Sequence, residues 1–336
     1  MTKNPSLLKN PEIDAWISFS MDGLINVRIG KVDIGQQIST AIARIVSEEL
    51  DLDPKRIVMA MPDTINSPNE GMTSGSNSME ESGNAIRLAA ATIRETLMEL
   101  AARKLNTSVD SLEVLDGTIS SRETDRTTNY WDLQGGRLFN KAINVEAKVK
   151  PGDLYGKSQK LHSGANIADI VTGSYKFIQD VNLNSMLHAR PVRPPNINSE
   201  LDQIDVKVVE HLKKNGITLI RNGSFLAVAG IDEYEVIKAA NTVKKSAVWK
   251  QLRKFESAPI FEQIKNNKRI SLKVLDGMPT EAPMATDIKI APNIKSTYSR
   301  PYVMHASIAP SAAVAKFEEN ELEIWTHSQG IYLLRA

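Results

Sequence analysis

A glycine-flanked turn, Gly30-Lys31-Val32-Asp33-Ile34-Gly35-Gln36-Gln37, begins one helical pattern of this chain, and Thr73-Ser74-Gly75-Ser76 begins a second, longer one. Both stretches offer small or hydroxyl residues, and the first adds two amides. The first turn of a helix leaves backbone N–H groups without partners, and such groups bind phosphates and other anions without a metal ion. The two stretches therefore predict a site for a polar, phosphate-bearing cofactor.

The composition limits the class of protein. The chain has 336 residues, 24% of them charged, and a formal net charge of +1. This length favours two or three subdomains. The near-neutral charge gives no reason to expect nucleic acid as a partner. The absence of cysteine excludes disulfides, thiolate zinc sites and iron–sulfur clusters within this chain, so electrons from any redox reaction would have to leave through another subunit.

Hydrophobic periodicity predicts the elements of the N-terminal part. Residues 14–29 read as a hairpin, and a helix follows Gln37 as far as Leu50. A strand is expected at 56–59. The second helix is expected to begin at 73–76 and to continue to about residue 105.

Shorter elements are predicted for the remaining chain. Strands are expected at 175–178, 186–192, 204–209, 218–220, 225–229 and 322–325, and a helix at 232–244. Residues 251–295, rich in Lys, Asn and Pro, are expected to be irregular. After Gly330 a helix starts and stops within six residues, which is too short to be stable alone. We therefore expect the polypeptide to be part of something larger, of fold class α+β.

Five motifs occur in a fixed order along the chain. They are Gly30–Gln37 with Thr40-Ala41, Asp63-Thr64 with Glu70–Ser76, Met186–Pro195, Met304-His305-Ala306, and Trp325–Gly330. Together they resemble the molybdopterin-binding subunits of the xanthine dehydrogenase/aldehyde oxidase family, most of all the branch of isoquinoline 1-oxidoreductase β subunits and nicotinate dehydrogenases. The resemblance runs from about residue 12 to the end.

The resemblance implies a partial molybdopterin-binding domain with an inserted α/β hammerhead-like domain. The implied parts are an N-terminal molybdopterin-binding segment (1–150), the hammerhead-like domain (151–250), a connecting arm (251–295) and the truncated start of a second molybdopterin-binding segment (296–336). The two outer segments are expected to pack together. The turns near Gln36 and Thr73 would then lie close to Gln329.

The resemblance also implies a subunit of a molybdenum hydroxylase, which hydroxylates an N-heterocycle or oxidises an aldehyde. The implied cofactor is molybdopterin with molybdenum, in the cytosine dinucleotide form. Electrons would pass to iron–sulfur clusters on a small partner subunit and onward to a flavin or cytochrome subunit. A complementary C-terminal molybdopterin-binding half would be a further partner, and no nucleic acid is expected.

Seven cofactor-binding candidates follow from matching the family's motifs. They are Gly35 and Gln36 in the first turn, Thr73, Gly75, Ser76 and Ser78 in the segment that holds the phosphate side, and Gln329 beside the molybdenum. No residue matches the family's glutamate base, which lies in a half that this sequence lacks. No catalytic residue or metal ligand is therefore assigned, and the chain alone is not expected to turn over substrate. Gln37 replaces the usual glycine, which would hold the backbone further from the cofactor.

Plainer interpretations stand beside these assignments. Gln36 could cap a turn, Thr73 and Ser76 are favoured N-cap residues of any helix, and Gln329 could cap the terminal helix. Glu70 could be mistaken for the catalytic base, although it lies outside the family's base position.

Arg190 and Arg193 are read as surface charge, with contact to a partner subunit or to a cofactor phosphate as the alternatives.

Two other functions compete with this one on the sequence. One is a truncated relative that binds no cofactor, which the intact 71–78 loop disfavours. The other is a generic nucleotide-binding α/β protein, but neither G-x-G-x-x-G after a strand nor G-x-x-x-x-G-K-[ST] occurs. The N-terminus has no apolar signal core, which predicts a cytoplasmic protein as written, or a periplasmic one if an export signal has been lost.

Overall fold

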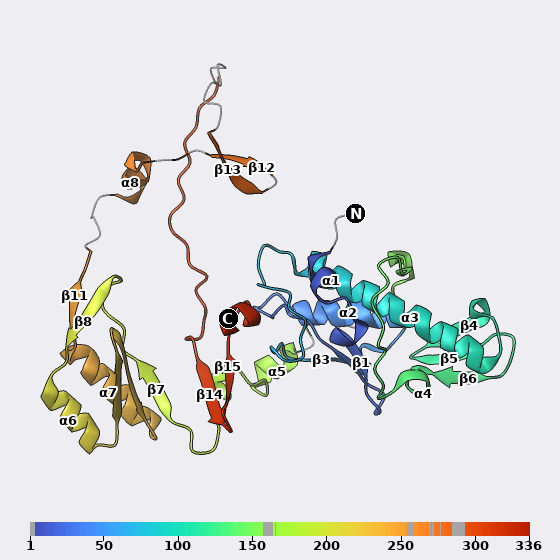
Figure 1. Ribbon diagram of the computed structural model, residues 1–336, viewed down its shortest axis with the longest axis horizontal. Coiled ribbons are helices and arrows are strands. Elements are labelled where there is room, and N and C mark those ends of the chain that lie inside the picture. Colours follow the sequence, from blue (N-terminus) through green and yellow to red (C-terminus); the bar gives the residue numbers. More distant parts are fainter. Residues whose placement is uncertain are drawn as a thin grey trace. The chain divides into compact units, whose positions relative to one another are not determined.

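The computed structural model describes residues 4–156, 164, 166–253, 259–268, 270, 272–275, 277–283 and 293–336. The chain divides into two compact units, Met1–Val181 with Ser311–Ala336 and Asn182–Pro310 (Figure 1). They are called the first and the second unit below. Both mix helices with small sheets, so the α+β fold class predicted from the sequence is confirmed.

A small sheet begins the first unit. The predicted hairpin is confirmed: β1 (Ile17–Phe19) pairs antiparallel with β2 (Ile25–Val27). The predicted third strand, β3 (Ile57–Met59), lies parallel to β2. Parallel neighbours need a crossover connection, and α2 (Ile38–Leu50) supplies it.

Two packed helices form the centre of the first unit. The 22-residue helix α3 (Asn84–Leu105) packs against α2, as Figure 1 shows. Its first turns contain Ala89, Ala90 and Ala91, all fully buried, and alanine both favours the helix and lets a neighbouring backbone come close. Larger buried side chains complete this core: Trp16, Ile25, Ile42, Val46, Leu50, Ile86, Ile93 and Leu97.

The start of the second helix differs from the prediction. Thr73-Ser74-Gly75-Ser76 lies in a loop, and helical structure begins only with a π-helical turn at Met79–Gly83 that leads into α3. Both Gly75 and Ser76 have positive φ angles, +65° and +61°, which a helix cannot contain. The prediction that this stretch opens the helix was wrong, and so were the N-cap interpretations of Thr73 and Ser76.

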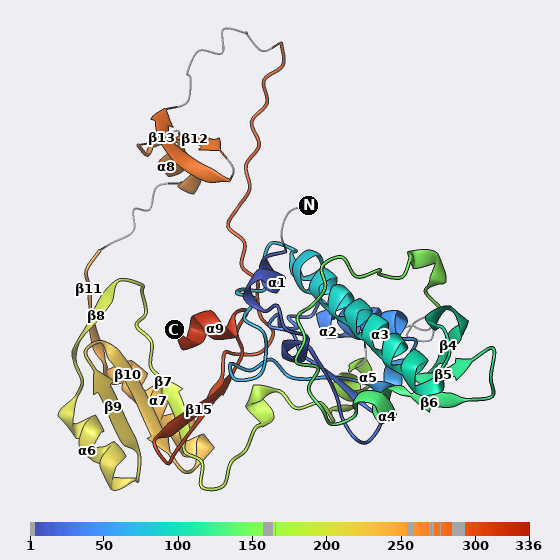
Figure 2. The same cartoon turned by 45° about the vertical axis from the view of Figure 1, so that its right-hand side comes forward.

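The other elements of the first unit are short. They are α1 (Pro5–Lys9), the sheet of β4 (Leu112–Leu115), β5 (Thr118–Ser121) and β6 (Thr127–Asn129), α4 (Tyr130–Gln134), α5 (Ile167–Thr172), β14 (Ala313–Glu318), β15 (Glu321–Thr326) and α9 (Ile331–Arg335). Hairpin β14–β15 leads directly into α9 (Figure 2). No strand forms at 175–178, where Ile178–Asp180 is instead a 3-10 turn that the Asp180 carboxylate closes on the Phe177 N–H.

The second unit is built on the sheet β7–β10–β9, whose strands are His188–Pro191, Phe225–Gly230 and Thr218–Asn222. Helices α6 (Val206–Lys214) and α7 (Glu233–Ser246) pack against this sheet, and Figure 1 shows them beside its strands. A second pair joins β8 (Ser199–Gln203) to β11 (Val248–Gln251).

Two expectations for the second unit were wrong. The strand expected at 204–209 is the beginning of α6, because the Asp205 carboxylate accepts the Lys207 N–H and caps a helix at that point. The stretch 251–295 is not simply irregular, since it contains α8 (Ile260–Asn266) and the hairpin of β12 (Leu272–Leu275) and β13 (Met278–Pro283). The predicted domain boundaries and the role of 251–295 as an arm stay predictions.

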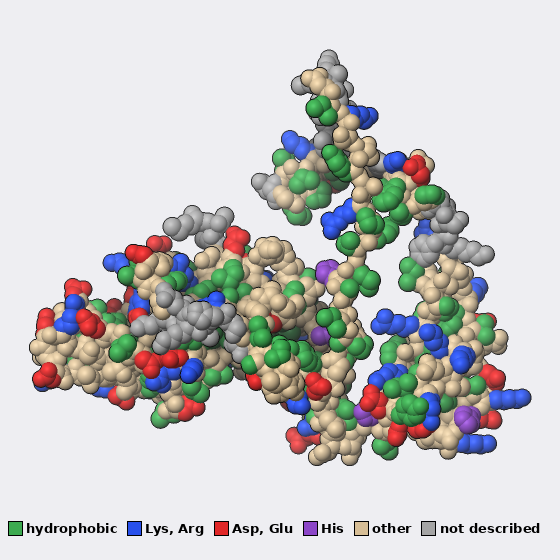
Figure 3. All heavy atoms as spheres, turned by 180° about the vertical axis from the view of Figure 1, so that it is seen from behind, with side chains coloured by type: hydrophobic (Ala, Val, Ile, Leu, Met, Phe, Trp, Pro, Cys, Tyr) green, Lys and Arg blue, Asp and Glu red, His purple; other side chains and the backbone are tan. Residues whose placement is uncertain are grey.

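The surface of each unit mixes charges of both signs. Figure 3 shows acidic and basic side chains interspersed over the visible face, with apolar side chains between them. In the part of the chain that the structure describes, no helix combines the length and the apolarity needed to cross a membrane.

Candidate functional site

Two predicted site residues, Thr73 and Gln329, lie against each other in the first unit. The Thr73 N–H donates to the Gln329 carbonyl at 2.6 Å, and the Gln329 side-chain amide donates back to the Thr73 carbonyl at 3.0 Å. These residues are 256 positions apart in the sequence. The expected approach of the C-terminal segment to the 73 loop is therefore confirmed.

The first turn joins the same cluster through Val32. The Val32 N–H donates to the Thr73 hydroxyl at 2.9 Å, and the Val32 carbonyl accepts the Gln36 side-chain amide at 2.9 Å. The Gln36 side-chain oxygen accepts the Ile34 N–H at 2.5 Å. Gln36 therefore holds its own turn together in this structure, as the turn-capping interpretation expects.

Both turns contain exposed residues whose backbone donors make no hydrogen bond to described residues. Gly35, Gln36, Gly75 and Ser76 are exposed, and within the described residues their N–H groups make no hydrogen bond. Gly35 has a φ of +99°, a conformation that glycine tolerates best. Gln37, at the family's glycine position, adopts the same left-handed region with a φ of +59°. The backbone shape expected of glycine is thus kept with a larger residue.

Three of the candidates, Thr73, Ser78 and Gln329, do not cap a helix through their side chains. Thr73 is buried, and its hydroxyl serves as an acceptor rather than as a helix cap. Ser78 stands directly before the π-helical turn, but its side chain makes no capping hydrogen bond. Gln329 precedes α9 without capping it, since its amide reaches Thr73 instead.

Lys31 was missed as an individual site residue by the sequence reasoning. Its side chain is only 3% exposed, and its ammonium donates to the Glu70 carbonyl at 2.9 Å, the Met72 carbonyl at 3.0 Å and the Glu81 carboxylate at 2.7 Å. The available signal was a lysine within an otherwise apolar run, between Ile29 and Val32. Such a lysine suggests a buried cation with partners elsewhere in the chain.

Glu70 is a structural residue in this arrangement. Its side chain is 6% exposed, and its two oxygens accept the Gly30 N–H and the Ser82 hydroxyl, each at 2.7 Å. Gly30 has no room for a side chain, because an added Cβ would lie 2.1 Å from the Pro68 carbonyl. Since both oxygens of Glu70 are occupied, its geometry favours the structural interpretation over that of a catalytic base.

The C-terminal helix α9 forms hydrogen bonds with the beginning of the loop that contains Thr73. The Tyr332 hydroxyl donates to the Ser67 carbonyl, and the Arg335 guanidinium donates to the Thr64 carbonyl at 3.1 Å. Burial opposes ionisation of the neighbouring Asp63, but the N–H groups of Asn66 and Ile65 outweigh it and lower the pKa of that carboxyl. Segments 30–37 and 329–335 therefore hold the loop 63–76 at both ends.

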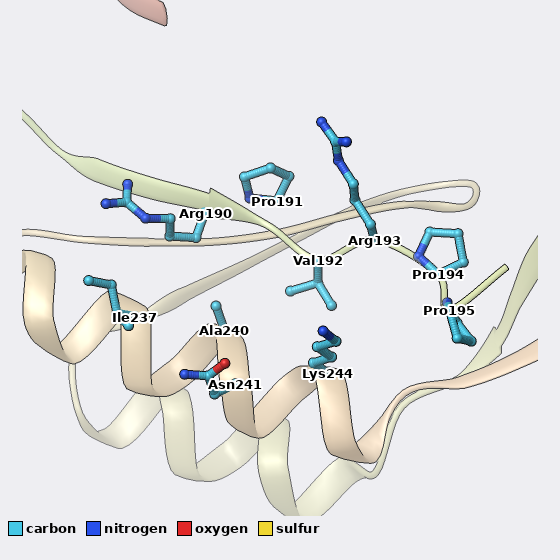
Figure 4. Close-up of a pocket in the computed structure, with 10 residues that line it drawn as sticks. All are labelled: Arg190, Pro191, Val192, Arg193, Pro194, Pro195, Ile237, Ala240, Asn241 and Lys244. Carbon is cyan, nitrogen blue, oxygen red and sulfur yellow. The ribbon is translucent and has the colours of Figure 1, made fainter. Parts of the chain in front are cut away.

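A groove in the second unit contains Arg190 and Arg193. It has a volume of about 480 Å³ and lies between α7 and the segment that continues β7 (Figure 4). Arg190 pairs with Glu233, and in Figure 4 the Arg193 side chain points away from α7. The groove contains none of the seven predicted cofactor-binding residues. The interpretation of these arginines as surface charge fits this placement.

The first unit is thus an α+β domain that holds a glycine- and serine-containing loop between two distant segments and leaves backbone donors exposed. The molybdopterin cofactor-binding domain family matches residues 1–170. This is about half of the chain, and the chain belongs to that family.

Named relatives cover different shares of the chain. A nicotinate dehydrogenase subunit of Pseudomonas putida is 30% identical over 340 residues, which span 98% of this chain but 28% of the relative. The beta subunit of isoquinoline 1-oxidoreductase of Brevundimonas diminuta is 28% identical over 36% of this chain and 16% of the relative. A solved CO dehydrogenase from Oligotropha carboxidovorans is 24% identical, with a TM-score of 0.32, over 35% of this chain and 15% of that one.

Within the described residues, no group of three or more His, Cys, Asp or Glu side chains is placed to hold a metal ion.

Proposed function

We propose that this chain is the molybdopterin-binding part of a molybdenum hydroxylase subunit, which hydroxylates an N-heterocycle or oxidises an aldehyde together with partner chains. The proposal builds on membership of the molybdopterin cofactor-binding domain family. It assigns cofactor binding to Gly35, Gln36, Thr73, Gly75, Ser76, Ser78 and Gln329. Catalysis is assigned to no residue of this chain.

The reciprocal hydrogen bonds between Thr73 and Gln329 carry the proposal. They join two motifs from distant parts of the chain. Surface loops are usually more mobile than the elements that they connect. A loop held by a segment 256 residues away is instead held in one position, which suits recognition of a fixed ligand.

The donors present fit an anionic cofactor. Gly35, Gln36, Gly75 and Ser76 are exposed residues, and their N–H groups bond to no other described residue. Successive N–H groups in left-handed turns form concave anion sites, and phosphate is the anion that they commonly hold. When bound, the molybdenum cofactor supplies two-electron oxidation chemistry.

The chain's own residues would orient that cofactor. Gly75 and Ser76 would present backbone donors to its phosphates, and Thr73 joins the loop to the first turn by accepting the Val32 N–H. Gln329 lies where its side chain touches the same loop, and Gln36 would have to exchange its contact with Val32 for one with the cofactor. We propose that the molybdopterin bound by these residues is in its cytosine dinucleotide form.

Partner chains complete the proposed function. A chain without cysteine cannot hold an iron–sulfur cluster, so we assign the clusters to a small partner subunit. Onward transfer to a flavin or cytochrome subunit and a complementary molybdopterin-binding half belong to the same proposal.

The test is to purify the chain alone and after co-expression with the products of neighbouring genes, and to measure molybdenum, pterin fluorescence and the nucleotide released by mild acid. We expect molybdenum, pterin and CMP in the co-expressed complex. A complex that forms but contains neither metal nor pterin overturns the proposal in favour of a relative that binds no cofactor.

Two variants sharpen this test. Gln329→Ala should lower the pterin content of the complex, because it removes an amide that reaches the loop. Gln134→Ala is the matched control, since Gln134 also donates its amide to a backbone carbonyl, that of Arg137 at 3.0 Å, within the same unit. Equal pterin loss in both variants would indicate a general loss of stability rather than a site at Gln329.

A further inference from the structure

Lys31 uses every hydrogen-bond donor that it has. An ammonium has three N–H groups. Two of them bond to the carbonyls of Glu70 and Met72, and the third bonds to the Glu81 carboxylate. Lysine is almost never fully buried unless it is paired. The three hydrogen bonds of Lys31 therefore stabilise its ammonium in a position where the residue is only 3% exposed.

Two of these partners lie directly before Thr73. The carbonyls of Glu70 and Met72 belong to the backbone that leads into Thr73, on either side of Gly71 with its φ of +69°. By holding two carbonyls of this short stretch, the ammonium fixes the path along which the chain enters the loop. No neutral side chain of similar length offers three donors at one atom.

The third partner belongs to the π-helical turn before α3. Glu81 lies in this turn and receives Lys31, and its neighbour Ser82 donates to the Glu70 carboxylate. A π-helical turn widens the helix locally and occurs often at functional sites. In this chain it carries two consecutive residues, of which Glu81 binds Lys31 and Ser82 binds the Glu70 side chain.

We propose that Lys31 is a positioning residue for the cofactor-binding loop. It fixes the backbone of residues 70–72, and thereby Thr73 and the Gln329 side chain bonded to it. This inference rests on the proposed function, and it assigns Lys31 no contact with the cofactor or with substrate. It states that loss of the ammonium weakens cofactor retention even when the fold is kept.

The first experiment measures pterin release from the purified complex of Lys31→Met and the unchanged protein. Methionine fills a similar volume without donors. We expect pterin to be lost about 10-fold to 100-fold faster, the range seen when residues that orient metal ligands are removed. Lys31→Arg should not rescue retention, because a planar guanidinium cannot replace three donors on one nitrogen.

Lys150→Met is the matched control. The Lys150 ammonium donates to the Glu48 carbonyl at 2.8 Å and to the Asp51 carboxylate. It therefore has the same kinds of partner as Lys31, in the same unit, but it does not contact the 70–76 loop. We expect this variant to lose stability and to keep the pterin release rate of the unchanged protein.

A double variant separates positioning from stability. Lys31→Met with Glu81→Leu replaces the whole ion pair by apolar groups, which commonly restores stability lost when only one partner is removed. The Glu70 and Met72 carbonyls still lack their donor in this variant. We expect the thermal midpoint to recover in part, because no unpaired charge is left, and the fast pterin release to persist.

The outcomes are distinguishable. If the unchanged complex holds no pterin, the proposed function fails and this inference fails with it. If the unchanged complex holds pterin and Lys31→Met releases it at the same rate, only the inference is overturned. Recovery of retention together with stability in the double variant would also overturn it, since Lys31 would then act through stability alone.

Discussion

Of the three glutamates buried in the first unit, Glu48, Glu49 and Glu70, the last two have very different surroundings. Glu49 is fully buried and accepts from two cations, Arg87 at 3.1 Å and Arg94 at 2.7 Å. Glu70 accepts only neutral donors, the Gly30 N–H and the Ser82 hydroxyl, and the nearby Lys31 binds its carbonyl rather than its carboxylate. One carboxylate is balanced by charge and the other by hydrogen bonds.

The difference distinguishes the residues that stabilise the domain from those that support its proposed cofactor site. Glu49 lies on α2 and its arginines on α3, and its oxygens also accept the Lys150 N–H and the Tyr155 hydroxyl. This network ties two helices to the segment 150–155. The Glu70 network ties a loop to a turn and a helix start, and that loop contains Thr73. We expect damage to the first network to reduce stability and damage to the second to reduce cofactor binding.

Glu49→Leu should have the largest effect of the predicted variants. Two arginines would lose their buried partner, which costs about 3 kcal/mol in the free energy of unfolding. Urea unfolding followed by circular dichroism measures this loss. The pterin content per folded chain should stay unchanged, and a selective loss of pterin would contradict the assignment of Glu49 to the residues that stabilise the domain.

Ser82→Ala should cost about 1–3 kcal/mol, because it leaves one buried oxygen of Glu70 without a donor. Ser47→Ala provides the control, since the buried Ser47 hydroxyl donates to the Leu52 carbonyl at 2.6 Å near the end of α2. Both variants are expected to unfold at lower urea concentration. Only Ser82→Ala should also speed pterin release from the complex, and equal release rates would remove Ser82 from the site.

Glu70→Gln is expected to change stability by about 1 kcal/mol, since an amide can still accept the Gly30 N–H and donate to the Ser82 hydroxyl. Turnover by the loaded complex should therefore remain close to that of the unchanged protein. A general base replaced by its amide typically costs 10²-fold to 10⁴-fold in rate. A loss of that size would restore the catalytic interpretation of Glu70.

The regular elements were predictable where a hydrophobic stripe is long. The stripe from Ile38 to Leu50 marks α2, and that from Ile86 to Leu105 marks α3, because each spacing repeats over several turns. The prediction of a strand at 204–209 was wrong because the stretch is short and rich in valine, a pattern that fits a strand or a helix. The capping residue Asp205 stabilises the helix.

The contact between Thr73 and Gln329 was predictable, but the residues that support it were not. The resemblance to the family placed both residues in one predicted site, and the structure brings them into contact. The burial of Lys31 was not predictable, because its partners at 70, 72 and 81 come from other elements. The sequence also suggested a helix start at Thr73, since favoured cap residues do not reveal the two left-handed residues that follow.

The smallest expected effect concerns pH and belongs to the Glu49 network alone. Burial first, and then the charge of Glu49, raises the pKa of the Tyr155 phenol above its usual value near 10. The folded state thus keeps a proton that the unfolded chain releases above about pH 10, so stability contributed by Tyr155 is present below that pH and is lost as the pH rises further. Between pH 9 and about pH 11, we expect the free energy of unfolding of Tyr155→Phe to fall less steeply with rising pH than that of the unchanged protein. Because the Glu70 network contains no tyrosine, Ser82→Ala should keep the slope of the unchanged protein, and an equal change of slope in both variants would contradict the separation of the two networks.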